Sequence, residues 1–307
     1  MAEVPMAAAG SPAASTTAPT SPTPGPPAVG DVGPSSSHHE MVALWRLYRR
    51  LVGAQIRSEW QYRTSFVFFL LAQALITALE LAAIVILLDV VPDLGGWTPA
   101  QVALLYGLAT VPFALTDLLV SPVEELSTHV QSGTFDRLLL RPVSALVQLC
   151  ALEFELRRIG KLIPNLAALV VGLVATGVDV TPRSVGLLVI ALGSGSAIYA
   201  ALWILAASIS FWAVSALQAT HAFTYGGQFA NQYPLHLYPG WIRAVLGWLI
   251  PLAFVAYVPA VELIDAPNPL GLPNGLVLAS PVVAAAALAA AFAVWTTGIR
   301  HYQSTGS

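Results

Sequence analysis

Long apolar runs alternate with short polar segments along most of the chain, and this alternation predicts a bundle of membrane-spanning helices. A helix needs about 20 residues to cross roughly 30 Å of hydrocarbon, and five of the six runs are long enough. The third run is shorter and draws on the segment before it, whereas the fourth is long enough to tilt or break. The six predicted spans are residues 66–88, 101–121, 162–178, 185–214, 244–264 and 276–297.

The composition places the chain among membrane proteins. It is 56% hydrophobic and 9% charged over 307 residues, with a mean hydropathy of +0.73. A soluble domain carries roughly 25% charged residues. The single cysteine, Cys150, excludes an intrachain disulfide, and the six histidines show no helical metal-ligand spacing. We therefore predict an all-α integral membrane protein with neither a metal site nor a cofactor of its own.

Two different segments precede the first span. Residues 1–38 are mostly Ala, Pro, Ser, Thr and Gly, which bury too little to offset the entropy of ordering, so a disordered tail is predicted. This tail lacks the basic start and apolar core of a secretory signal. Residues 39–63 predict an amphipathic helix in the membrane interface, although docking on protein is the alternative. Its apolar face includes Trp45, and its basic face consists of Arg46, Arg49, Arg50 and Arg57.

Arginine and lysine predict the orientation. Five lie in 46–63, five lie in the loop 122–161, and Arg300 follows the last span. Only Arg183 falls in a loop on the other face, while Arg243 begins the fifth span from the majority face. The positive-inside rule therefore places both termini and the loop in the cytoplasm. The predicted domains are the tail, the interfacial helix, a six-span transmembrane domain that contains the loop 122–161, and a cytoplasmic C-terminus, at residues 1–38, 39–63, 64–299 and 300–307.

The loop 122–161 contains the most conspicuous polar motif. Its residues 133–142 read GTFDRLLLRP. This pattern indicates a turn at Gly133 followed by a short helix that Pro142 ends.

A few polar side chains lie inside the predicted spans. Gln73, Thr77 and Glu80 share one helix face because they are spaced i, i+4, i+7. Asp117 belongs to a similar stripe in the second span. A charged group near a span centre costs about 2.5–3.5 kcal/mol, so both carboxyl groups should face protein or water. Either these groups line a transport pathway, or they make hydrogen bonds between helices.

The segment 211–241 differs from the spans because it has no charged residue yet is broken by Gly and Pro. We predict an interfacial or re-entrant element there. Pro251 and Pro259 should kink the fifth span, because each removes a helix hydrogen bond. In the fourth span, Gly193, with alanines at four-residue spacing after it, predicts a packing face.

A nucleotide-binding motif is missing. The Gly-Lys pair 160–161 has Glu155 where a P-loop needs its first glycine, and Leu162 where it needs Ser or Thr. If ATP drives transport, the motor is another polypeptide.

On these residues the chain resembles the ABC type-2 permease family, the membrane subunits of ATP-binding-cassette exporters. Within that family it is similar to a bacterial subgroup formerly of unknown function. The resemblance covers about residues 42–307. It rests on the GTFDRLLLRP run, the Tyr-Pro pairs at 233–234 and 238–239, the prolines at 251 and 259, and the closing IRHYQSTGS.

The resemblance implies a coupling helix in the loop 122–161 that receives the motion of the ATPases. Phe135 and the leucines would fill a groove on the ATPase, with charged residues at the rim, and replacing Phe135 by Asp would uncouple ATPase activity from transport. The implied coupling residues are Gly133, Phe135, Asp136, Arg137, Leu138, Leu140, Arg141 and Pro142.

The resemblance also implies the partners. Two ATPase subunits would bind ATP and Mg, and a second permease, identical or related, would complete the pathway in the bacterial plasma membrane. Membrane lipids are further partners, and no nucleic acid is expected. An apolar lumen with few polar groups suits an amphipathic or hydrophobic substrate such as a drug, lipid or secondary metabolite.

Other functional classes remain open from the residues alone. An ion-coupled secondary transporter would use Glu80 and Asp117 as proton or sodium sites, but no repeat relates the two halves of the chain. An intramembrane enzyme lacks a nucleophile–base constellation. A membrane scaffold that transports nothing is the last alternative.

Overall fold

The computed structural model describes residues 53, 56–57, 63–90, 94–141, 143–152, 154–213, 217–264 and 268–302. The tail 1–38 lies outside the described residues, as does Pro142. Most of the interfacial helix 39–63 also lies outside them, including Trp45, Arg46, Arg49 and Arg50. These predictions therefore stay predictions.

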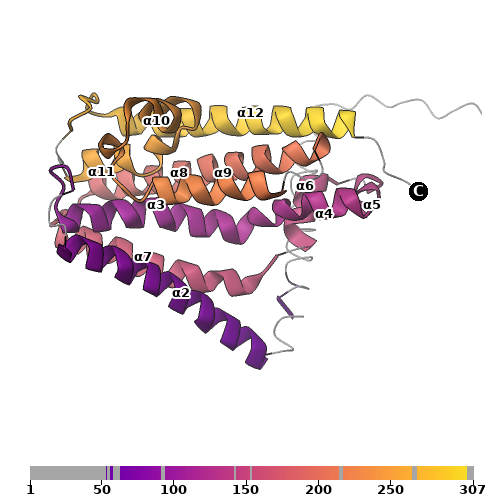
Figure 1. Cartoon of the computed structure of the whole chain (residues 1–307), viewed down its shortest axis with the longest axis horizontal. Helices are drawn as coiled ribbons and strands as arrows, with labels where there is room; N and C mark the ends of the chain where they lie inside the picture. The colour runs from indigo at the N-terminus through magenta and orange to yellow at the C-terminus, as the bar shows by residue number, and fades with distance from the viewer. Residues whose placement is uncertain are drawn as a thin grey trace, which may run out of the picture. The chain divides into compact units, whose positions relative to one another are not determined.

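The described residues form helices and no strand, as the all-α prediction requires (Figure 1). Four helices are long and apolar enough to cross a membrane, namely Pro99–Leu119, Leu156–Ala175, Pro182–Phe211 and Leu276–His301. A fifth candidate, which we call the bent pair, consists of Gly240–Leu249 and Leu252–Ile264, with a 73° bend between them. The first long helix, α2 (Arg63–Val90), coincides with the first predicted span.

Two of the long helices begin at capping boxes that the sequence encodes. α3 (Pro99–Leu119) starts after Thr98. The Thr98 hydroxyl accepts from the backbone N–H of Gln101, and the backbone N–H of Thr98 donates to the Gln101 side chain at 2.9 Å. α8 (Pro182–Ser208) starts in the same way after Thr181. In both cases a proline occupies the first helical position, where its missing N–H costs nothing.

α3 lies at the centre of the bundle and packs most closely on α7 (Ile159–Ala175). The two helices are antiparallel, because Gly107 faces Leu169 while Gly172 faces Leu104. A Cβ added at either glycine would lie 2.5 Å from the Cα of the facing leucine. Only glycine therefore lets these two backbones approach so closely.

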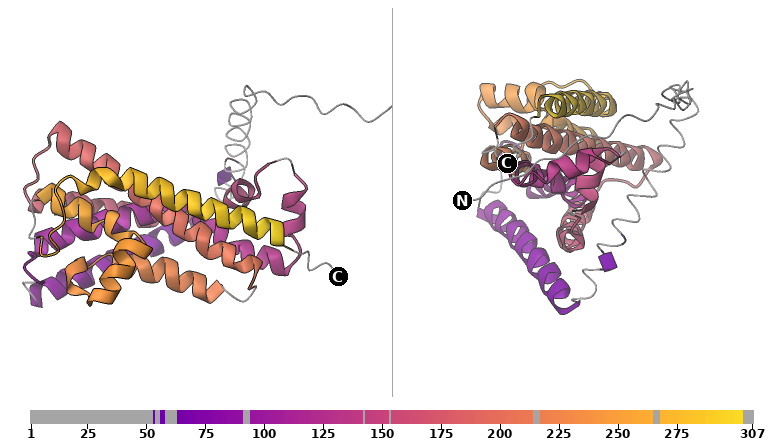
Figure 2. Two further views of the ribbon diagram at one scale, coloured as in Figure 1. Left: turned by 90° about the horizontal axis from the view of Figure 1, so that it is seen from above. Right: turned by 90° about the vertical axis from the view of Figure 1, so that its right-hand side faces the viewer.

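Helices on the other flanks complete the bundle. α8 packs on both α3 and α12 (Ser280–His301), whereas α2 packs mainly on α7 and lies at the margin (Figures 1 and 2). The predicted packing glycine is not the one used here. Gly193 faces open space, whereas Gly195 lies against Pro112 and Val255.

The bundle has two different ends. We call the end that carries residues 121–152 the loop end, and there α3 finishes and α7 starts (Figure 1). The opposite end holds the connections α2–α3 and α7–α8, and we call it the pocket end because a cavity lies there.

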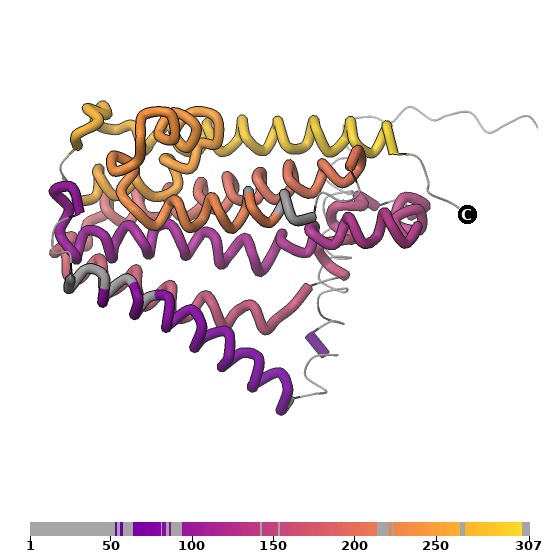
Figure 3. The backbone as a smooth tube through the Cα atoms, in the orientation of Figure 1, coloured from indigo at the N-terminus to yellow at the C-terminus, as the bar shows by residue number. Residues whose placement is uncertain are grey.

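The bent pair starts and finishes at the pocket end. Just before it, the His236 side chain hydrogen-bonds to the carbonyl of Gly95 in the α2–α3 connection at 3.0 Å. In its last turn, Glu262 pairs with Arg183 at the start of α8 at 2.8 Å. A segment with both ends at one end of the bundle enters and returns, as the tube in Figure 3 also shows. The prediction of a fifth span at 244–264 is therefore wrong.

The chain instead returns from the loop end through α9 (Leu217–Ala230). In the middle of α9, Thr224 donates a hydrogen bond to Glu124 at the loop end at 3.5 Å. Directly after α9, Asn231 donates to the hydroxyl of Tyr199 in the middle of α8 at 3.2 Å. α9 therefore runs antiparallel to α8.

Because α9, and not the segment 244–264, returns from the loop end, Arg243 does not lie where the sequence predicted. It lies in α10 (Gly240–Ala244), where the bent pair begins, and therefore at the pocket end rather than with the majority of the basic residues. The region 211–241 contains α9, and the re-entrant element follows it. A count of six crossings remains a prediction, with α9 in the fifth place.

Cysteine labelling tests this topology. We replace Cys150, the single native cysteine, by Ala and introduce Val180→Cys, Leu237→Cys or Leu140→Cys, all at exposed positions. In sealed vesicles, an impermeant thiol reagent should label positions 180 and 237 from one side and position 140 from the other. Labelling of 237 together with 140 would restore the fifth span that the sequence predicted.

Substitution of the contact glycines tests the α3–α7 packing. Gly107→Ala or Gly172→Ala should lower the free energy of unfolding by about 1–3 kcal/mol, because the new methyl group forces the backbones apart. Gly186→Ala is the matched control, since its Cβ would meet open space in a helix. It should be neutral or stabilise by up to about 1 kcal/mol. Equal melting temperatures for all three variants in detergent would contradict the close approach.

Candidate functional site

The predicted turn and short helix are present at the loop end. α4 (Leu126–Gln131) and α5 (Phe135–Leu139) are separated by Gly133, whose φ of +66° requires glycine. The Thr134 hydroxyl lies 2.8 Å from both the His129 ring and the Ser132 hydroxyl. These contacts hold the turn in one conformation.

Phe135 points into the protein, which changes its expected role. Its side chain is 0% exposed and packs against Phe211 and Tyr302, at centroid distances of 5.5 and 5.2 Å. Leu138 is buried as well. The ring therefore anchors α5 to the ends of α8 and α12, and it does not present a surface that fills a groove on a partner.

The residues that α5 presents outward are others. Leu140 is 85% exposed and Leu139 is 39% exposed. Arg137 and Arg141 are also exposed, and Asp136 is half-buried. Two leucines flanked by two arginines thus form the outer surface, which we call the α5 patch (137, 139, 140 and 141). Contact between this patch and a partner stays a prediction.

Gln148 positions the chain that follows α5. It lies in α6 (Ala145–Leu152), is buried, and donates its amide N–H groups to the carbonyls of Leu138 at 3.0 Å and Val143 at 2.9 Å. These two bonds fix the backbone on both sides of residues 139–141, the exposed part of the α5 patch. The sequence gives no signal for this role, because the partners are backbone atoms.

Asp117 is the best-paired charge of the site. Its carboxylate is fully buried at the end of α3, and its two oxygens accept from Arg158 at 2.6 Å and Lys161 at 2.8 Å. Arg158 also donates to the hydroxyl of Ser121 and to Glu155 at 2.9 Å. A buried carboxylate is tolerated only with such compensation. The cluster joins the end of α3 to the start of α7.

Glu124 forms a second polar contact at the loop end. It lies in the short helix η1 (Ser121–Glu125) and accepts from the indole N–H of Trp203 in α8 at 2.7 Å. The hydroxyl of Thr224 lies at 3.5 Å and the His221 ring at 3.6 Å, both from α9. Burial raises the pKa of the Glu124 carboxyl group. Glu124 therefore links η1 to α8 and α9.

The other predicted polar stripe lies elsewhere. Thr77 is buried and donates to the Gln73 carbonyl within α2 at 3.1 Å, while Glu80 lies on the exposed surface of α2. Among the described residues, no hydrogen bond or ion pair joins Glu80 to Asp117. The Asp117 side chain packs into the interhelical contacts, which is the second of the two predicted readings. Arg57 of the predicted interfacial helix is described, and it is exposed.

The helices and the polar loop define the class first: an all-α protein that crosses the membrane several times and carries a folded loop at one end. Residues 74–306 match the family model described as ABC-2 family transporter protein. The chain therefore belongs to the ABC-2 transporter family, whose members are membrane components of transporters. Neither a curated protein sequence nor a solved structure matches the chain.

Removal of the Asp117 charge tests the cluster. Asp117→Asn should lower the free energy of unfolding by about 3 kcal/mol, because Arg158 and Lys161 keep partly buried charges without a counter-ion. The measurement is the melting temperature of the full chain in detergent.

Glu125→Gln is the matched control, because Glu125 is an exposed carboxylate close to the same loop. It should change the stability by less than about 0.5 kcal/mol. If both variants have the melting temperature of the wild type, the cluster contributes nothing to the stability of the fold.

Proposed function

We propose that the chain is the permease subunit of an ATP-binding-cassette exporter, and that the ATPase binds the α5 patch and transmits its motion there. One observation carries this proposal above the others. The patch combines two exposed leucines and two arginines on a loop that is held firmly from inside. An apolar centre with a charged rim is the composition of a protein contact.

The same loop is connected to the transmembrane helices by buried polar contacts. Asp117, paired with Arg158 and Lys161, joins the last turn of α3 to the first turn of α7. Glu124 joins η1 to α8 through Trp203. A displacement of the loop would therefore move the ends of three helices together, as coupling between a motor and a pathway requires.

The remaining parts of the proposal follow from the family. Two ATPase subunits would bind ATP and Mg, and a second permease, identical or related, would complete the pathway. The loop end and both termini would face the cytoplasm of a bacterial cell, with the substrate moving outward. The substrate would be amphipathic or hydrophobic, such as a drug, a lipid or a secondary metabolite.

The ion-coupled alternative is less well supported. Both oxygens of Asp117 already have cationic partners, so repulsion from Arg158 and Lys161 disfavours a sodium ion at that carboxylate in this conformation. Glu80 would have to act without Asp117. Transport by the reconstituted chain in the absence of any ATPase would favour this alternative.

Leu140→Asp tests the proposed contact. The purified permease should lose its cognate ATPase on size-exclusion chromatography, with affinity reduced by about thirtyfold or more, because an aspartate replaces an apolar anchor. Vanadate-sensitive ATP hydrolysis by the complex should fall in parallel. Phe135→Asp is unsuitable for this test, since a charge at a fully buried ring would destabilise the loop itself.

Leu237→Asp is the control, because Leu237 is an exposed leucine at the pocket end. It should retain the ATPase. If Leu140→Asp binds the ATPase and hydrolyses ATP as the wild type does, the α5 patch is not the contact.

A further inference from the structure

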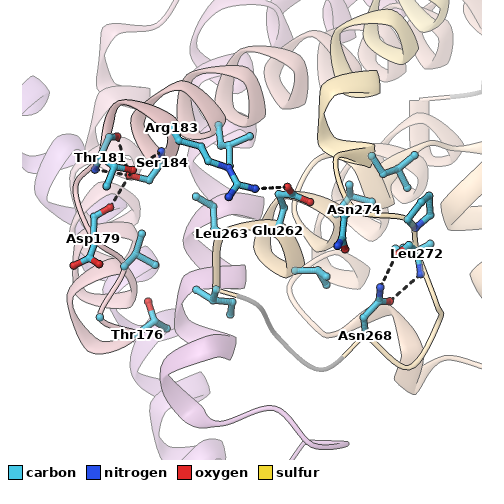
Figure 4. A pocket seen from close by; sticks show the side chains of 18 residues that line it. Thr176, Asp179, Thr181, Arg183, Ser184, Glu262, Leu263, Asn268, Leu272 and Asn274 are labelled. Carbon is cyan, nitrogen blue, oxygen red and sulfur yellow. Dashed lines mark hydrogen bonds and ion pairs between the residues drawn. The ribbon is translucent and has the colours of Figure 1, made fainter.

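A cavity of about 770 Å³ lies at the pocket end, away from the coupling loop. Its walls come from the end of α7, the start of α8, α11 (Tyr257–Ile264) and the segment that leads into α12. This volume is typical of small-molecule sites. Figure 4 shows the Arg183–Glu262 ion pair across the middle, with Asp179 on one side and Asn274 on the other.

The polar groups of the cavity divide into those already used and those still available. Glu262 is used twice, because it pairs with Arg183 at 2.8 Å and accepts from the backbone N–H of Gly275 at 2.8 Å. Asn268 is used as well, since its amide bonds to both the N–H and the carbonyl of Leu272. These contacts build the wall and leave little capacity for a ligand.

Asp179 and Asn274 remain available. Within the described part of the chain, no ion pair or side-chain hydrogen bond involves either side chain. Arg183 and Glu262 neutralise one another, so the described lining residues leave one unmatched negative charge, at Asp179. An unmatched carboxylate in a concave polar site attracts a cation.

The cation that fits is organic. Among the described residues, no group of three or more His, Cys, Asp or Glu side chains could hold a metal ion, and calcium needs six to eight oxygen ligands. The amide of Asn274 can instead donate to and accept from hydroxyl groups, and the hydroxyl oxygen of Thr176, whose proton is donated to the Gly172 carbonyl, can accept from them.

We propose that this cavity binds a small hydroxylated organic amine, with its ammonium group at Asp179 and its hydroxyl groups toward Asn274. The site lies beyond the proposed transport function. Its available groups are hydrophilic, whereas the proposed substrate is amphipathic or hydrophobic. Because the cavity lies at the pocket end, away from the α5 patch, binding there can be measured without ATP or an ATPase.

Glucosamine and N-acetylglucosamine are suitable probes, because they share their ring hydroxyl groups and differ in charge. The full chain in lipid nanodiscs is titrated with each sugar, and binding is followed by saturation-transfer NMR. The wild type should bind glucosamine about threefold to fivefold more tightly, the size of an exposed charge interaction. Asp179→Asn should remove this preference, and Asp179→Lys should reverse it.

Two controls separate the proposal from its alternatives. Glu125→Gln removes a carboxylate at the loop end and should keep the wild-type preference. Asp179→Asn preserves the backbone carbonyl that accepts from the Ser184 hydroxyl, so its melting temperature should match the wild type. Absence of binding by the wild type, or an equal preference in Asp179→Asn, would overturn the proposal.

Discussion

The buried charge of Asp117 is the constraint on which the loop end depends. A carboxylate removed from water needs close cations, and Arg158 and Lys161 can supply them only if the first turn of α7 lies beside the last turn of α3. The same antiparallel register then places Gly107 against Leu169 further along. Electrostatic pairing at one end and close backbone contact along the helices therefore specify the same arrangement.

The local secondary structure of the loop end could be predicted from the sequence, whereas the directions in which its side chains point could not. The turn at Gly133 and the helix that starts at Phe135 depend on neighbours in the chain, and both are present. The inward direction of Phe135 depends on Phe211 and Tyr302, which are distant in sequence. A short helix with apolar residues on several sides does not reveal which of them is buried.

The fifth predicted span illustrates a limit of hydropathy. Residues 252–260 are apolar because they are buried in protein, and burial in protein demands the same composition as burial in lipid. α9 contains the polar residues Thr224 and Gln228, both buried against neighbouring helices, and so it does not stand out as a span. Only the contacts of each segment's ends distinguish the two.

The unequal anchoring of the helices bears on how the protein would move. α3, α7 and α8 share buried polar contacts with the loop end, whereas α2 packs chiefly on α7 and exposes a long apolar surface. A force applied at the α5 patch would reach the three anchored helices as a unit, because packed interiors transmit strain. α2 would follow only through α7, so relative motion would be concentrated at the α2–α7 contact. There Gly160 of α7 lies against the backbone of α2, and Arg157, just before α7, lies over the Phe69 ring of α2 at 5.3 Å, so a shift of the two helices would have to change these contacts.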